Sequence, residues 1–158
     1  MREILFRGKE AYKDRWVNGV PVKATSVDES EILIIESVFE CDEYACRGCD
    51  FTPVIPETVG QYTGLTDKNG TKIFEGDILK GYVYPFFNEE KDEFNYFAEV
   101  VWFENSPAFG CVTHKNPLSK VNGISSGNTD YLEDFYSNCW EVIGNIHDNP
   151  ELLGGETK

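Results

Sequence analysis

The stretch Gln61-Tyr-Thr-Gly-Leu-Thr-Asp-Lys-Asn-Gly-Thr-Lys-Ile-Phe-Glu-Gly-Asp-Ile-Leu79 decides the fold. Two short strand segments flank Asn69-Gly70, a dipeptide that favours a hairpin because both residues adopt positive φ at little cost. A second sharp turn is expected at Gly76-Asp77, where glycine frees the backbone and the carboxylate bonds nearby amides. The stretch predicts β structure, and it contains no catalytic pattern. The fold-determining turn residues are Asn69, Gly70, Gly76 and Asp77.

Outward from this stretch, short segments rich in β-branched and aromatic residues recur, and helical periodicity is scarce. Strands are predicted at residues 4–7, 16–17, 21–23, 32–39, 52–55, 61–66, 72–74, 77–83, 97–103, 110–113 and 140–146. Asn18-Gly19 predicts a tight turn between the second and third of these strands. Single helical turns are expected at residues 56–59 and after Asn149, which is a good N-cap before Pro150.

Two strands carry more specific expectations. Ile32-Leu-Ile-Ile35 is apolar at every position, which predicts a strand covered on both faces. In the last strand, alternation places Trp140, Val142, Gly144 and Ile146 on one face.

The chain is accordingly predicted to be mainly β with very little helix. A boundary at about residue 58 separates an N-terminal β subdomain, residues 1–58, from a C-terminal part, residues 59–158, which we expect to be of small SH3-like barrel type. At 158 residues the two parts fit one compact unit. No apolar run reaches about 18 residues, and residues 4–6 are too short for a signal peptide, so we expect a cytoplasmic protein.

Charge is the strongest compositional feature. The chain has 28 acidic and 14 basic side chains, a net charge of −14. Five basic residues lie near the N-terminus, and no arginine follows Arg47. Most of the surface is thus expected to repel a phosphate backbone, which argues against nucleic-acid binding unless the N-terminal residues form a patch. These residues are Arg2, Arg7, Lys9, Lys13 and Arg15.

The five cysteines are an odd number, which is typical of reduced thiols in a cytoplasm. Cys41, Cys46 and Cys49 form C-x4-C-x2-C, but tetrahedral zinc requires four ligands, usually from paired knuckles. Three residues elsewhere are candidates for a fourth ligand: Cys111, His114 and Cys139. We expect ordinary thiols and no cofactor, with structural zinc or a redox pair as the alternatives.

Catalytic signals are weak. Only His114 and His147 are available for histidine chemistry, and no nucleophile elbow or phosphate-binding loop is present. Asp67, Glu75 and Asp77 are carboxylates able to bind a divalent cation or act in acid–base chemistry. Because Asp67 and Asp77 adjoin glycine-containing turns, local backbone hydrogen bonding is the preferred interpretation.

The stretch from Tyr82 to Phe87, followed by acidic residues, is the candidate contact surface. Exposed aromatic side chains anchor interfaces, and acidic neighbours attract a basic partner. Packing of Phe86 and Phe87 back onto the barrel is the alternative. The aromatic residues of this surface are Tyr82, Tyr84, Phe86 and Phe87.

Three blocks together resemble the YopX family of phage and prophage proteins. They are Met1-Arg-Glu-Ile-Leu-Phe-Arg-Gly8, the stretch from Gln61 to Leu79, and Glu141-Val-Ile-Gly-Asn-Ile-His-Asp-Asn-Pro-Glu-Leu-Leu153. Val100-Val-Trp-Phe-Glu104 and Ala108-Phe-Gly110 extend the resemblance. It implies an intracellular, phage-borne or prophage-borne protein of a family without an established activity, and it supplies no catalytic residues.

The expected function is therefore protein–protein contact without catalysis, by an acidic protein that self-associates through strand edges and the apolar strand 32–35. One alternative is a hydrolase that uses a divalent cation held by carboxylates near Asp77, with His114 or His147. Another is an acidic decoy that occupies a nucleic-acid-binding protein of the host.

Overall fold

The computed structural model describes residues 3–25, 30–41, 43–44, 46–82, 95–115, 129–132 and 140–153. Across these ranges strands dominate and helix is confined to short 3₁₀ segments, so the mainly-β prediction is confirmed. None of the helices in this part of the chain has the length and hydropathy needed to span a bilayer. The chain divides into two compact units, Met1–Tyr62 and Thr63–Lys158. The predicted boundary at residue 58 falls at the end of a 3₁₀ helix, η1 (Pro56–Thr58).

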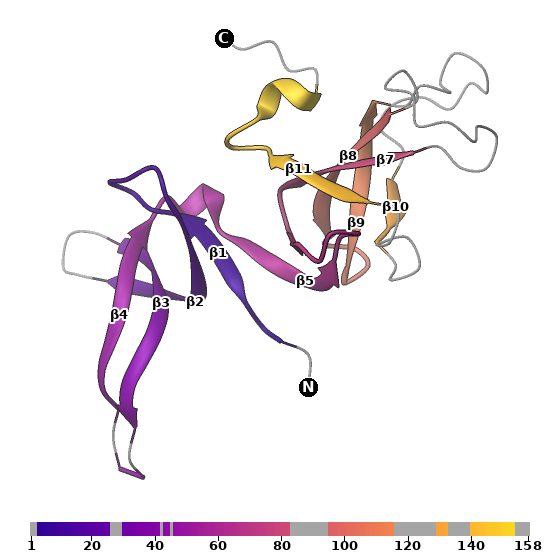
Figure 1. The fold of residues 1–158 in the computed structure, drawn as a ribbon. Coiled ribbons are helices and arrows are strands. Elements are labelled where there is room, and N and C mark those ends of the chain that lie inside the picture. The colour runs from indigo at the N-terminus through magenta and orange to yellow at the C-terminus, as the bar shows by residue number, and fades with distance from the viewer. Residues whose placement is uncertain are drawn as a thin grey trace. The chain divides into compact units, whose positions relative to one another are not determined.

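The first unit is built from antiparallel strands in the order β4-β3-β2-β1-β5 (Figure 1). β3 and β4 run side by side as a long hairpin, and an extra residue forms a bulge in β3 between Ile35 and Ser37. After η1 the chain enters β5, which pairs with β1 and continues into the second unit. The strand bounds are β1 (Phe6–Lys9), β2 (Trp16–Thr25), β3 (Ser30–Cys41), β4 (Cys46–Val54) and β5 (Gly60–Thr66).

The core of the first unit covers one face of this sheet. Val17, Ile34 and Val54 are buried together, and Ile32 and Val59 pack against them. Because successive strand residues point to opposite faces, Ile32 and Ile34 lie on the inner face. Leu33 and Ile35, from the same apolar run, lie on the outer face, and both are only partly buried.

The predicted turn at Asn18-Gly19 is wrong, because both residues lie within the continuous strand β2. Gly19 is opposite Phe6 on β1, and a Cβ at Gly19 would run into the backbone carbonyl of Ile35 on β3. Glycine is therefore required here for the close approach of a neighbouring strand rather than for a turn.

The second unit contains a five-stranded antiparallel sheet in the order β10-β9-β8-β7-β11. Its described strands form an open sheet with β10 and β11 at the ends. Ile73, Leu79 and Val100 form the buried core, against which Trp140 and Val142 pack. The element bounds are β6 (Lys72–Phe74), β7 (Asp77–Tyr82), β8 (Asn95–Phe103), β9 (Ala108–Lys115), β10 (Thr129–Tyr131), β11 (Glu141–Asn145) and the 3₁₀ helix η3 (Pro150–Leu153).

The expectation that Trp140, Val142, Gly144 and Ile146 share one face is wrong at β11. Val142 is opposite Leu79 and Gly144 is opposite Ile78, with a register shift between them. Since Ile78 and Leu79 are consecutive and face opposite ways, their partners also lie on opposite faces. The bulge adds one residue and breaks the alternation that the sequence pattern assumes.

Candidate functional site

The turn between β5 and β6 is organised by Asp67, which is 4% exposed. Its Oδ1 accepts hydrogen bonds from the backbone amides of Asn69 and Thr71, both at 2.8 Å. The Gly70 amide donates to the Asp67 carbonyl at 2.9 Å, so Lys68 and Asn69 are the central turn residues. Gly70 follows them with φ of 83°. The turn is thus a three-residue loop with glycine in the left-handed position, not a two-residue Asn-Gly turn.

The same turn is tied to the start of β11. The Val142 amide donates to Asp67 Oδ2 at 3.0 Å, and the Lys68 amide donates to the Trp140 carbonyl at 3.0 Å. Lys68 Nζ and Glu141 Oε2 form an ion pair at 3.0 Å. Burial raises the pKa of Asp67, but hydrogen bonds from the three backbone amides outweigh it and hold the pKa below its ordinary value.

The second turn places Gly76 and Asp77 at the entrance to β7. Gly76 has φ of 78°; its amide donates to the Val100 carbonyl, and its carbonyl accepts from the Ile146 amide, both at 2.9 Å. Asp77 is 1% exposed, and its Oδ2 accepts from the Phe74 amide at 2.7 Å. Two of the three carboxylates singled out as possible cation ligands, Asp67 and Asp77, therefore accept hydrogen bonds from turn backbone amides.

The two histidines lie in different settings. His114 Nε2 is 3.0 Å from Glu99 Oε2, across the β8–β9 pair. The backbone amide of His147 donates to Asn145 Oδ1 at 3.0 Å, and the imidazole ring of His147 lies beside Gly76. Within the described residues, no group of three or more His, Cys, Asp or Glu side chains is placed to hold a metal ion.

The register of the β3–β4 hairpin separates the cysteines of the C-x4-C-x2-C motif. Cys41 and Cys46 occupy directly opposed positions, and Cys49 is opposite Val38. Positions 46 and 49 are three apart on one strand, so they lie on opposite faces of the hairpin. Cys49 is exposed and Cys111, on β9, is buried, and neither forms a disulfide. Cys139 lies outside the described residues.

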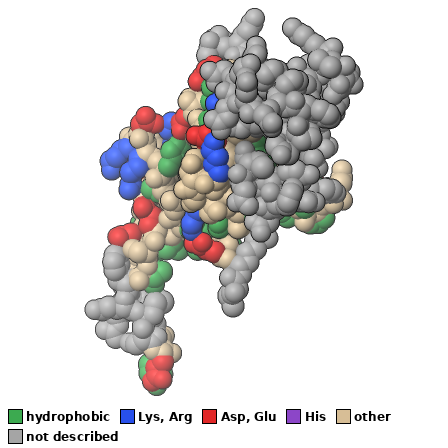
Figure 2. Space-filling view, turned by 45° about the vertical axis from the view of Figure 1, so that its right-hand side comes forward, with side chains coloured by type: hydrophobic (Ala, Val, Ile, Leu, Met, Phe, Trp, Pro, Cys, Tyr) green, Lys and Arg blue, Asp and Glu red, His purple; other side chains and the backbone are tan. Residues whose placement is uncertain are grey.

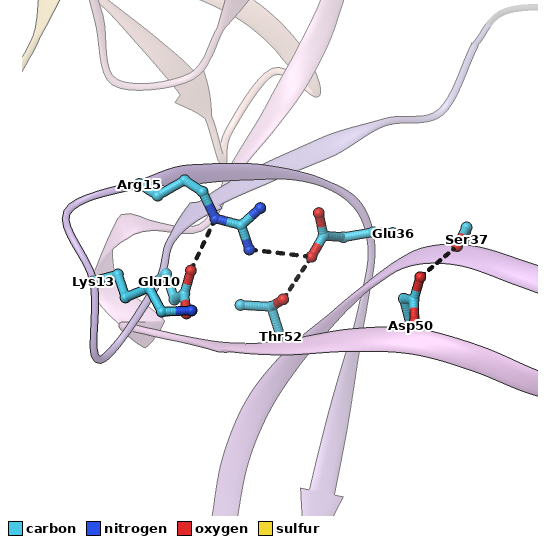
Figure 3. Close-up of polar contacts among 7 residues, drawn as sticks. All are labelled: Glu10, Lys13, Arg15, Glu36, Ser37, Asp50 and Thr52. Atoms are coloured by element: carbon cyan, nitrogen blue, oxygen red, sulfur yellow. Dashed lines mark hydrogen bonds and ion pairs between the residues drawn. The ribbon is translucent and has the colours of Figure 1, made fainter.

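A polar cluster on the first unit was not predicted from the sequence (Figure 3). Arg15 Nε donates to Glu10 Oε2 at 2.9 Å, and its Nη2 lies 3.7 Å from Glu36 Oε1, which also accepts from the Thr52 hydroxyl. Hydrogen bonding to Arg15 lowers the pKa of Glu10, and the same contact raises the pKa of Arg15. The cluster fastens the β1–β2 connection to β3 and β4, which no local spacing in the sequence indicates.

The basic residues near the N-terminus are engaged by neighbours. Lys9 pairs with Asp14 at 2.7 Å, and Lys13 pairs with Glu10 at 3.3 Å. The Arg7 guanidinium lies over the Trp16 ring, 4.8 Å from its centroid. Figure 2 shows basic and acidic side chains interspersed on the described surface, with hydrophobic side chains between them. Arg2 lies outside the described residues.

The aromatic contact surface expected from the sequence cannot be placed. Tyr84, Phe86 and Phe87 lie outside the described residues, and Tyr82 is described only as the last residue of β7.

A different apolar surface is present on the outer face of β2, β3 and β4. The register aligns Val20 with Ile35, and Ile35 with Phe51, in one cross-strand row. Val22 and Leu33 form the next row. We define the outer apolar face by its six members: Val20, Val22, Leu33, Ile35, Val38 and Phe51.

The bulge in β3 keeps Val38 on this face, because one extra residue shifts the alternation. Val38 is opposite Cys49, which shares a face with Phe51 two positions along β4. Val20, Val38 and Phe51 are 55%, 51% and 57% exposed. The all-apolar run at residues 32–35 was the sequence signal for this surface, but the contributions from β2 and β4 became apparent only through the register.

Comparison with known proteins places the chain in one family. Residues 5–154 match the family model described as YopX protein. A crystal structure of protein EF1440 from Enterococcus faecalis is similar in fold, with a TM-score of 0.53 and 23% sequence identity. The alignment covers 97% of this chain and 99% of that one. No protein with a curated description matches. The resemblance inferred from the three sequence blocks is confirmed, and the chain belongs to the YopX protein family.

Proposed function

We propose that this protein acts by protein–protein contact, packing its outer apolar face against an apolar surface of a protein partner, and that it catalyses no reaction. The observation that carries the proposal is the exposure of Val20, Val38 and Phe51, each more than half exposed, on one side of one sheet. Isolated apolar side chains on a surface are ordinary, but a contiguous set is typical of interaction sites.

Two of the carboxylates considered for catalysis, Asp67 and Asp77, have a structural role in their turns. Asp67 and Asp77 accept hydrogen bonds from turn amides, which is a sufficient reason for an aspartate at each position. Cys49 and Cys111 form no disulfide, which suits the reducing cytoplasm of a bacterial host, where we place this phage-borne or prophage-borne acidic protein.

The experiment is alkylation of Cys49 in intact cells that express the protein, read by peptide mass spectrometry. Cys49 adjoins Val38 and Phe51, so a bound partner shields its thiol. The reference is an Asn105→Cys variant, which presents a thiol at an exposed position in the β8–β9 turn of the second unit.

We expect Cys49 to be alkylated several-fold more slowly in cells than in dilute purified protein, with the reference thiol alkylated equally in both. Equal rates at Cys49 in both settings would contradict the proposal. If cross-linking captured a basic nucleic-acid-binding protein at a surface other than this face, the alternative function as an acidic decoy would be favoured instead.

A further inference from the structure

We infer that Asn69 is a site of spontaneous deamidation, at which the Gly70 amide nitrogen attacks the Asn69 side chain and water completes the conversion to aspartate and isoaspartate. Asparagine followed by glycine is especially prone to this reaction, because glycine has no side chain to hinder the attack. The chain contains three such pairs: Asn18-Gly19, Asn69-Gly70 and Asn122-Gly123. The third pair lies outside the described residues. The structure distinguishes the first two, which the dipeptide alone cannot do.

The reaction requires the backbone to rotate at the asparagine. The amide nitrogen of the glycine forms a bond to Cγ of the asparagine, and the bond between Cγ and Nδ2 breaks. The amide proton leaves with Nδ2 as ammonia, and a five-membered cyclic imide remains. A water molecule then opens the imide at either carbonyl, which gives aspartate or an isoaspartate whose main chain runs through Cγ. The pair therefore reacts only where the local backbone can leave its native conformation.

The turn between β5 and β6 permits this rotation. Asn69 and Gly70 are both exposed, and no atom lies within 4 Å of the position that a Cβ of Gly70 would take. The attacking nitrogen donates a hydrogen bond to the Asp67 carbonyl at 2.9 Å, which must open first. Exposed loops open locally at a much lower free energy than paired strands do. The turn should therefore slow the reaction relative to the unfolded chain without preventing it.

The chemically identical pair in β2 is held in place. The Asn18 side chain is exposed, but Gly19 is buried. Asn18 and Gly19 are opposite Arg7 and Phe6 of β1. On the other side, β3 lies so close that a Cβ at Gly19 would run into the carbonyl of Ile35. Rotation at Asn18 would disrupt the strand pairing, so we expect this pair to react only when the first unit unfolds.

The modification would act on the hydrogen bonds of Asp67. Isoaspartate adds one carbon to the main chain between the amide nitrogens of positions 69 and 70. Asp67 Oδ1 accepts from the amides of Asn69 and Thr71, so the longer main chain displaces one of these donors. The new carboxylate also places a second negative charge in the turn that contains Asp67. Modified protein should consequently hold this turn, and the start of β11 that is bonded to it, less firmly.

The test is prolonged incubation of the purified full chain in mildly alkaline buffer, both folded and in concentrated guanidinium chloride. Peptide mass spectrometry measures the conversion at each asparagine, and fragmentation that distinguishes isoaspartate from aspartate identifies the product. Asn18 in the same chain is the internal control. The matched variant is Asn69→Gln, which keeps an amide at the exposed position but would have to form a larger ring that closes more slowly.

We expect Asn69 to react several-fold faster than Asn18 in the folded chain, the two to react at comparable rates in denaturant, and position 69 to stay unmodified in Asn69→Gln. Equal rates at both positions in the folded chain would overturn the inference. An Asn69 that reacts only in denaturant would also overturn it, because the turn would then protect the pair. So would a preference for Asn69 that persists in denaturant, because sequence rather than structure would then cause it.

Discussion

The backbone amide of Val142 donates a hydrogen bond to Oδ2 of Asp67 at 3.0 Å, joining positions 75 residues apart in the chain. The other carboxylate oxygen holds the amides of the β5–β6 turn. One buried aspartate thus fixes the hairpin turn and docks β11 against it. The hydrogen bond therefore connects two of the three sequence blocks that resemble the YopX family, the stretch from Gln61 to Leu79 and the block that begins at Glu141.

Replacing Asp67 by asparagine should destabilise the protein by about 1–3 kcal/mol, because one buried amide then faces an NH₂ group that cannot accept its hydrogen bond. Urea unfolding measures the change in the free energy of unfolding. Glu151→Gln removes an exposed carboxylate from the same unit and should change stability by less than about 0.5 kcal/mol. Equal stabilities of the wild type and Asp67→Asn would show that the hydrogen bonds to Asp67 do not hold the turn.

Stability should fall on acidification below about pH 4.5. The pKa values of Glu10 and Asp67 are lowered in the folded chain from ordinary values of 4.5 and 3.8. Each carboxylate therefore contributes stability that is fully present above its ordinary pKa and is lost as the pH falls through the lowered native value. Glu10→Gln and Asp67→Asn should each flatten the acid limb of a plot of unfolding free energy against pH. If both variants lost stability with falling pH as steeply as the wild type, Glu10 and Asp67 would not be the carboxylates responsible for the acid dependence.

The central stretch was predictable because its turn chemistry is local. The residues of β6 coincide with the predicted strand, and Gly70 and Gly76 both have positive φ. The exact turn type was not predictable, because either Asn69-Gly70 or Lys68-Asn69 can be central, and Asp67 decides between them through two amides. In this stretch the sequence indicates where the two turns lie, and the hydrogen bonds of Asp67 determine which turn type forms between β5 and β6.

Features that depend on strand pairing escaped prediction. Asn18-Gly19 has the composition of a turn, yet Gly19 lies in the middle of β2. Glycine is needed there because the carbonyl of Ile35 occupies the space that a Cβ would fill. Likewise, Val20 and Phe51 are distant in sequence, and only their common pairing with Ile35 makes them neighbours. Register is a property of two or three strands together, so the pattern of one strand cannot supply it.

Gly76→Val should destabilise the protein by about 1–3 kcal/mol, because a β-branched residue resists a φ of 78°. The backbone cannot relax easily, since its amide and carbonyl are bonded to Val100 and Ile146. The comparison variant is Gly70→Asn, at φ of 83° with no atom within 4 Å of the added Cβ. Asparagine tolerates that conformation, so thermal melting should show a much smaller change. An unchanged melting temperature in Gly76→Val would refute the strain.

The purified protein should contain no stoichiometric zinc. The β3–β4 register puts position 49 on the opposite face of the hairpin from positions 41 and 46, so a zinc site that uses all three positions would require a different pairing. Elemental analysis of protein prepared without chelator measures the metal content directly. About one zinc per chain would show that the hairpin pairs differently from this register.

The central claim is that another protein surface covers the outer apolar face, and the alkylation rate of Cys49 tests it most directly. The measurement compares the rate in intact cells with the rate in dilute purified protein, with the Asn105→Cys thiol as the reference. The account predicts that Cys49 is alkylated several-fold more slowly in cells, while the reference thiol is alkylated equally in both settings. Equal rates at Cys49 in both settings would show that the face is uncovered and would contradict the account.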